Sequence, residues 1–148
     1  VWNSIESICF EKEIVNGIFL NIQKDENSYI FGVMIKISEE EFEVLKLREK
    51  NYSCVTIKKE DTFNQNLDED LIAFMTTKDD KIAKIGQENC FIPSRYIQIV
   101  KEGVKNFSKE FQDNFEDIFS NFPFEIKDGI YTFSDPIQNQ AAKNSEKL

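Results

Sequence analysis

The sequence predicts an α+β domain with a mixed, mostly antiparallel sheet. Short apolar runs occupy the first half of the chain and are separated by polar turns, as strands are. A capping box at Ser38 interrupts these runs and starts a helix. From Pro93 onward the apolar residues recur at helical spacing, so further helices follow the strands. We therefore expect a single domain over residues 1–135 and a loose polar tail over residues 136–148.

The strand candidates lie mainly in the first half of the chain. A polar turn at residues 24–28 separates an apolar run at 18–23 from another at 29–37, and this pattern predicts an antiparallel hairpin. Residues 29–37 are rich in β-branched and aromatic side chains, which favour strands. Further strand candidates are residues 4–10, 54–58, 71–77 and 129–133.

Three helices are predicted from their first turns. Ser38 and Glu41 form the capping box of the first helix. Ser94, after a proline, is typical of a second helix start, and Ser108 can cap a third. The third helix carries a wide apolar stripe, which indicates packing against a core rather than a ligand site. The stripe consists of Phe111, Phe115, Ile118, Phe119 and Phe122.

Glu49 is the residue of the first helix that periodicity singles out. Phe42, Leu45 and Glu49 stand at i, i+3 and i+7, so they share one helix face. A carboxylate on the face that points into the protein is paired, neutral or used for chemistry, because burying it unpaired is costly. The neighbouring Arg48 supports the paired interpretation, and a catalytic role is the alternative.

Composition excludes several classes of function. The formal net charge of −9 disfavours binding to a phosphate backbone, so we expect no nucleic-acid partner. The chain has no histidine, and Cys9, Cys54 and Cys90 are far apart, so neither a metal site nor a disulfide framework is predicted. No apolar run is long enough to span a membrane and no signal peptide is visible, which favours a cytoplasmic protein. Any catalysis would use carboxylate, tyrosine, lysine or cysteine side chains.

Four short motifs follow one another between Trp2 and about Phe119. They are Gly32-Val33-Met34-Ile35, Ser38 to Glu41, Leu45 to Glu49 with Tyr52 after it, and Pro93-Ser94-Arg95-Tyr96 running into Glu102-Gly103. In this order they resemble the gamma-glutamylcyclotransferase-like superfamily. The resemblance implies a small β-barrel or strongly curved sheet with flanking helices.

The chain departs from the pattern of this superfamily in two ways. The superfamily's Tyr-Gly-Ser motif, whose backbone amides hold the glutamyl part of the substrate, does not occur here. Because the chain begins at Val1, we expect the N-terminal strand that carries this motif to be missing. Lys46 and Lys50 stand where relatives carry an aspartate and often a glycine. A barrel without its first strand exposes an edge, so we expect the chain to form a homodimer, swap an element or cover the edge with its tail.

The resemblance also implies a reaction, the cyclisation of a gamma-glutamyl amine or peptide to 5-oxoproline with release of the amine. The substrate's own α-amine is the nucleophile, so one carboxylate that moves protons suffices and no cofactor is needed. Glu49 matches that catalytic acid, and Tyr96 and Tyr52 are the candidate substrate-binding residues. Two alternatives stay open. One is an inactive member of the same fold that binds a small molecule or a protein, and the other is an acidic protein that masks a basic partner.

Overall fold

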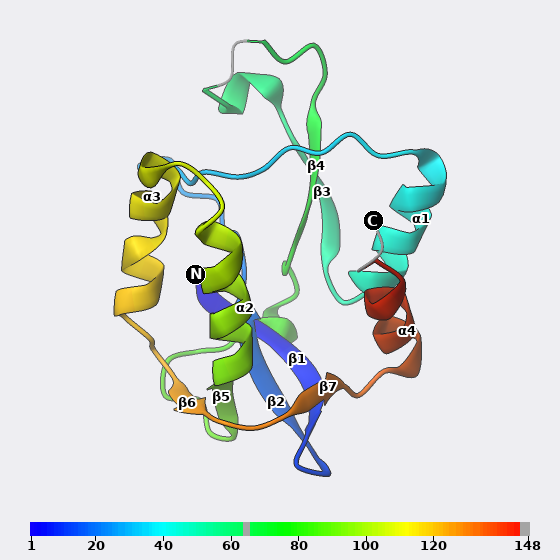
Figure 1. Cartoon of the computed structure of the whole chain (residues 1–148), viewed down its shortest axis with the longest axis vertical. Coiled ribbons are helices and arrows are strands. Elements are labelled where there is room, and N and C mark those ends of the chain that lie inside the picture. Colours follow the sequence, from blue (N-terminus) through cyan, green and yellow to red (C-terminus); the bar gives the residue numbers. More distant parts are fainter. Residues whose placement is uncertain (64–65, 146–148) are drawn as a thin grey trace.

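The computed structural model describes residues 1–63 and 66–145 and contains an open, mixed five-stranded sheet with a separate two-stranded hairpin (Figure 1). The strand order of the large sheet is β6-β5-β2-β1-β7. Its strands are β1 (Trp2–Phe10), β2 (Glu13–Leu20), β5 (Cys90–Pro93), β6 (Glu125–Lys127) and β7 (Tyr131–Phe133). The α+β prediction is confirmed, whereas the barrel or curved sheet implied by the resemblance is not found among the described residues.

β1 and β2 form the antiparallel hairpin at the centre of the sheet, with a register that ends at the pair Phe10 and Glu13. Glu11 and Lys12 make the turn with φ of 49° and 76°, the left-handed values that a two-residue hairpin turn requires. β2 therefore pairs with the strand before it, and the hairpin predicted across residues 24–28 is wrong. Residues 29–37 belong to neither sheet, so the strand predicted there is wrong as well.

The outer strands come from later parts of the chain. β5 pairs in parallel with β2, β6 pairs in parallel with β5, and β7 pairs antiparallel with β1. The sheet stays open because β6 and β7, each three residues long, are its outer strands and do not pair with each other. β7 covers β1 from Ile8 to Phe10, and Ser4 forms an isolated bridge to Ile82. The chain's own later residues thus cover part of the β1 edge.

The hairpin consists of β3 (Ser53–Ile57) and β4 (Leu71–Met75), which confirms the strands predicted at 54–58 and 71–77 with slightly shifted bounds. α1 (Glu39–Arg48) packs beside it, with the Phe42 and Phe74 ring centroids 6.3 Å apart. The capping box predicted at the start of α1 is present: Glu41 N–H donates to Ser38 Oγ at 3.2 Å, and Ser38 N–H donates to the Glu41 carboxylate at 2.6 Å.

The later helices are α2 (Ser94–Val104), α3 (Lys109–Ser120) and α4 (Pro136–Ser145). α2 and α3 begin where the sequence predicts, and Ser108 Oγ accepts a hydrogen bond from Phe111 N–H. α4 replaces the loose tail that we expected from residue 136. Asp135 explains this helix, because its carboxylate accepts hydrogen bonds from Ile137 N–H and Gln138 N–H, as an N-cap does.

The large sheet has two buried faces, because side chains alternate along each strand. On one face Ile5, Ile18 and Ile92 form a core that α2 and α3 cover. On the other face Ile8 and Phe19 form a smaller aromatic core. The register also places the polar side chains of Ser4 and Glu6 in β1 on this second face, and Glu6 belongs to the candidate site.

Candidate functional site

The turn that joins α1 to β3 carries two of the three residues that the sequence singles out. Glu49 closes α1, because its N–H donates to the Leu45 carbonyl at 2.8 Å. Tyr52 N–H then donates to the Glu49 carbonyl at 2.8 Å, which folds the chain back toward β1. The capping box at the other end of α1 fixes the phase of the helix, so Glu49 shares its half-buried face with Leu45 as predicted.

Two side chains of this turn are held by distant elements. Lys50 forms an ion pair with Asp135, which precedes α4. Asn51 Nδ2 donates to the Glu6 carboxylate in β1 at 2.7 Å and lies 3.4 Å from Gln138 Oε1 in α4. The turn is therefore fixed between the sheet and the C-terminal helix.

Glu6 is a buried acid that the sequence analysis missed. It is 2% exposed and lies opposite Gly17 in the hairpin. Burial raises the pKa of Glu6, and the negative charge of Glu49 raises it further. The hydrogen bond from Asn51 and the positive charge of Lys81 lower this pKa in part. The sequence did contain an indication that Glu6 is buried. Side chains alternate along a strand, so Glu6 shares a face of β1 with Ser4 and Ile8.

Glu49 is shielded but still reaches solvent, with a side chain that is 24% exposed. Burial raises its pKa, and the Arg48 guanidinium, whose Nε lies 3.0 Å from the carboxylate, lowers the pKa in part. Glu49 is therefore paired with Arg48 and also partly desolvated.

Tyr52 lies on the same side of β1 as Glu6. Its side chain forms a hydrogen bond with Ser4, the β1 residue two positions before Glu6. Burial raises the pKa of the Tyr52 hydroxyl, and the charges of Glu6 and Glu49 raise it further. The phenol is therefore a neutral hydrogen-bonding group at physiological pH.

Tyr96 reaches the same region from the first turn of α2. Its ring makes edge contacts with Trp2 and Phe19, with centroids 6.0 and 4.7 Å apart. Burial raises the pKa of Tyr96 to about 12, although a hydrogen bond with the Leu20 backbone acts in the opposite direction. The charge of Glu49 also raises this pKa, which indicates that the two side chains are close enough to interact. Tyr96 thus packs in the core, with its ring against Trp2 and Phe19.

The charge of Glu49 influences the pKa values of Glu6, Tyr52 and Tyr96, so these four residues form one electrostatically coupled group. We refer to these four residues as the acid–tyrosine cluster. Two carboxyl groups with raised pKa values beside two neutral phenols can hold a cation, share a proton or pass a proton to a bound group.

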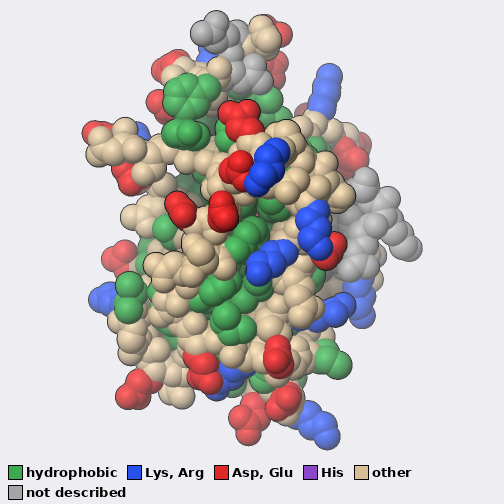
Figure 2. All heavy atoms as spheres, turned by 60° about the vertical axis from the view of Figure 1, so that its left-hand side comes forward, with side chains coloured by type: hydrophobic (Ala, Val, Ile, Leu, Met, Phe, Trp, Pro, Cys, Tyr) green, Lys and Arg blue, Asp and Glu red, His purple; other side chains and the backbone are tan. Residues whose placement is uncertain are grey.

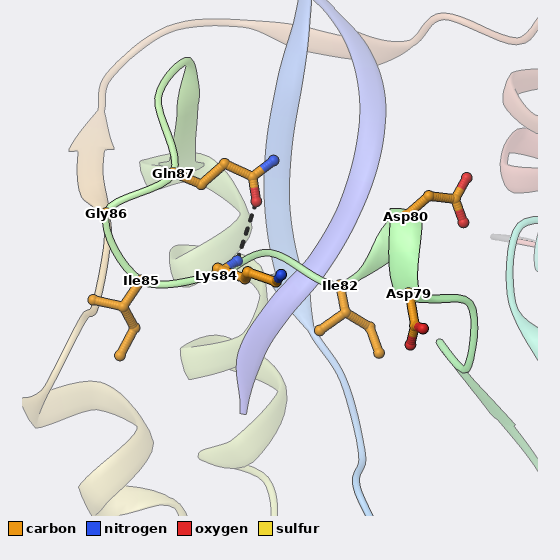
Figure 3. A pocket seen from close by; sticks show the side chains of 7 residues that line it. All are labelled: Asp79, Asp80, Ile82, Lys84, Ile85, Gly86 and Gln87. Carbon is orange, nitrogen blue, oxygen red and sulfur yellow. Dashed lines mark hydrogen bonds between the residues drawn. The ribbon is translucent and has the colours of Figure 1, made fainter.

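Two surface hollows lie away from the acid–tyrosine cluster. One, of about 440 Å³, is lined by Glu39, Glu40, Phe42 and Glu43 at the start of α1. The other, of about 520 Å³, is lined by Asp79, Asp80, Ile82, Lys84, Ile85, Gly86 and Gln87. Figure 3 shows it, with Gln87 folded back onto the Lys84 backbone and Asp79 at the far end. Both are open to solvent, and neither is lined by a member of the cluster.

The comparisons with known proteins identify no relative: no family model, no curated protein and no solved structure matches the chain. Within residues 1–63 and 66–145, no helix is long and apolar enough to cross a membrane. In the same part of the chain, acidic and cysteine side chains form no group that could hold a metal ion.

Proposed function

We propose that the chain is a gamma-glutamylcyclotransferase-like enzyme that uses Glu49 to move a proton. The observation that carries this proposal is the state of Glu49, a carboxylate with a raised pKa that is largely shielded from water and yet accessible. A base whose pKa lies closer to that of the substrate amine transfers protons more efficiently at neutral pH. The order of sequence motifs provides independent support, because it assigns the catalytic role to the same residue.

In the proposed reaction the ionised Glu49 accepts a proton from the substrate's α-ammonium group. The freed amine attacks the γ-carbonyl carbon, and a new C–N bond closes the five-membered ring. The original amide C–N bond then breaks as Glu49 returns the proton to the leaving nitrogen. The ring nitrogen gives up a second proton as it becomes the lactam N–H, and Glu49 passes this proton to the released amine, which leaves as an ammonium ion. The positive charge of the substrate's ammonium group is then carried by the released ammonium, so atoms and charges balance without a cofactor. In this proposal the hydroxyl groups of Tyr52 and Tyr96 donate hydrogen bonds to a carboxylate or carbonyl of the substrate.

A binding module without catalysis is the second candidate, and one observation favours it. The Arg48 Nε lies 3.0 Å from the Glu49 carboxylate, so this acid already has a partner of opposite charge. If this ion pair persists when a ligand is bound, Glu49 recognises the ligand and accepts no proton from it.

The test is the release of 5-oxoproline from a panel of gamma-glutamyl amines and dipeptides by the full protein. We expect Glu49→Gln to lower turnover by ~10²–10⁴-fold, because the amide keeps the shape of the side chain and cannot accept the proton. The matched control is Glu40→Gln in the exposed first turn of the same helix, which should leave turnover unchanged. Turnover of the parent should also decline at low pH, with a midpoint above 4.5, the ordinary pKa of glutamate.

Calorimetric titration with the same compounds separates the two candidates. Equal turnover by the parent and Glu49→Gln would exclude the catalytic role. Binding that is lost in Glu49→Gln, together with no turnover by the parent, would identify the binding module instead.

A further inference from the structure

Residues 29–37 form an exposed apolar segment outside both sheets. They run from the α3 side of the molecule to the start of α1, across the upper part of Figure 1. Five large hydrophobic side chains of this segment are between 49% and 70% exposed: Tyr29 64%, Ile30 50%, Val33 55%, Met34 49% and Ile35 70%. Folding normally buries such side chains, because each contributes ~1.5–3 kcal/mol when fully removed from water.

The backbone of this segment is also largely unpaired. Among the described residues, its one hydrogen-bonded backbone group is Phe31 N–H, which donates to Asn114 Oδ1 of α3 at 2.8 Å. A run of β-branched and aromatic residues with free N–H and C=O groups is a template for pairing with another strand. The sequence favours a strand here, and the residues that the structure describes offer it no partner strand.

The segment continues into an aromatic surface on α3. Phe31 stacks on Phe111 with ring centroids 6.0 Å apart, and Phe111 stacks on Phe107 at 4.5 Å. At the other side Tyr29 contacts the 85% exposed Phe63 at 5.6 Å. Figure 2 shows hydrophobic side chains reaching the surface in the middle of the face that it presents, with acidic and basic side chains around them.

We propose that residues 29–37 pair antiparallel with the same residues of a second copy of this chain, with the two-fold axis at Val33. This register is self-complementary. It places Lys36, the one charged residue of the segment, opposite Ile30 of the other copy, so no like charges oppose each other. It also places Gly32 opposite Met34, which leaves room for the long side chain.

The hydrogen bond of Phe31 predicts which backbone groups face the partner. Successive N–H groups of an extended strand point to opposite edges, and that of Phe31 points to α3. The free edge therefore presents the N–H and C=O groups of the even-numbered residues 30, 32, 34 and 36.

The exposed apolar area is sufficient for a dimer. Seven side chains contribute, the five of the segment together with Phe63 and Phe107, and they are between 41% and 85% exposed. At roughly 150–200 Å² for each large side chain they expose roughly 700 Å², close to the ~800 Å² that each partner buries in a standard interface. The net charge of −9 on each copy opposes association, so added salt should strengthen the dimer.

The test compares the parent with Met34→Pro by analytical ultracentrifugation at several protein and salt concentrations. Proline removes an N–H from the free edge and cannot join the ladder there. Within residues 1–63 and 66–145, the Met34 N–H forms no intrachain hydrogen bond that this substitution would remove. We expect a dimer for the parent and at least a tenfold weaker association for Met34→Pro. The control is Ile85→Pro, because Ile85 is 84% exposed and lies in a turn that tolerates proline. This turn is closed by the hydrogen bond from Gln87 N–H to the Lys84 carbonyl, and Gly86 has the positive φ of 82° that its third position requires. Proline is favoured at the second position, which Ile85 occupies. This control should dimerise like the parent.

Hydrogen exchange gives an independent outcome. Protection of the amides of residues 32, 34 and 36 that rises with protein concentration would support the pairing. A parent that stays monomeric at every concentration, protection that does not depend on concentration, or dimerisation of Met34→Pro equal to that of the parent would each overturn it.

Discussion

At the scale of single residues, a buried glutamate determines how the site responds to pH. Glu6 is 2% exposed, and burial raises its pKa above the ordinary 4.5. Such a group favours the fold while it is protonated, and this contribution is lost as the pH rises from 4.5 through the pKa of the folded state. Each unit of pKa elevation corresponds to ~1.4 kcal/mol.

Glu6→Gln should therefore stabilise the protein at neutral pH. The amide oxygen of glutamine can still accept the hydrogen bond from Asn51, and no buried charge remains. We expect the free energy of unfolding of the variant to exceed that of the parent by ~1 kcal/mol or more at pH 7, and the difference to vanish near pH 4. Denaturant unfolding at both values measures this, with the exposed Glu88→Gln as control. A variant that is less stable than the parent at pH 7 would show that the ionised Glu6 supports the fold.

At the scale of elements, some of the fold could be predicted from the sequence and some could not. α1 was predictable because the side chains of Ser38 and Glu41 cap it locally. The β1–β2 turn was not, because Glu11 and Lys12 adopt left-handed conformations that usually indicate glycine or asparagine. Residues 29–37 have the composition of a strand, but a strand also needs a partner, and composition does not supply one.

The candidate site could also be predicted from the sequence only in part. The position of Glu49 was predictable from the spacing of apolar residues in one helix. Phe42, Leu45 and Glu49 follow one another at intervals of three and four residues, which places them on one helix face. Glu6 was not identified, because its significance depends on Asn51, 45 residues later in the chain, and on Gln138 in α4. Local patterns do not encode contacts between such distant residues.

Alanine substitutions at Gly17 in β2 and Gly103 in α2 test how closely these two elements are packed. A Cβ added at Gly17 in β2 would lie 2.8 Å from atoms of Ile8 and of Phe19, which are 0% and 3% exposed. We expect Gly17→Ala to lower the free energy of unfolding by ~1–3 kcal/mol, because a filled core has no space for an added methyl group. Gly103→Ala in α2 meets no atom within 4 Å and should stabilise the helix by ~0.5–1 kcal/mol. Thermal unfolding of both variants measures the contrast, and equal effects would contradict the close packing above Gly17.

At the scale of the whole molecule, polar contacts join the β3–β4 hairpin to the large sheet. Asn21, directly after β2 and 8% exposed, is central to this junction. Its side-chain oxygen accepts a hydrogen bond from Thr76 N–H at 2.8 Å, and its Nδ2 donates to Asn3 Oδ1 at 3.1 Å. Thr76, just beyond β4, is also bonded to Ser4 through the two hydroxyl groups at 2.6 Å. The end of the hairpin is thereby fixed to β1 and β2, next to the acid–tyrosine cluster.

Asn21→Ala should loosen this junction. The substitution leaves the N–H of the buried Thr76 without its acceptor, which costs ~1–3 kcal/mol. We expect that loss in denaturant unfolding, together with faster hydrogen exchange in β3 and β4 than in β1 and β2, because the large sheet keeps its own pairing. Asn27→Ala in the exposed turn is the control and should change neither quantity. If exchange instead accelerated equally in both sheets, the hairpin and the large sheet would unfold as one cooperative unit, and Asn21 would support the whole fold rather than a junction between two parts.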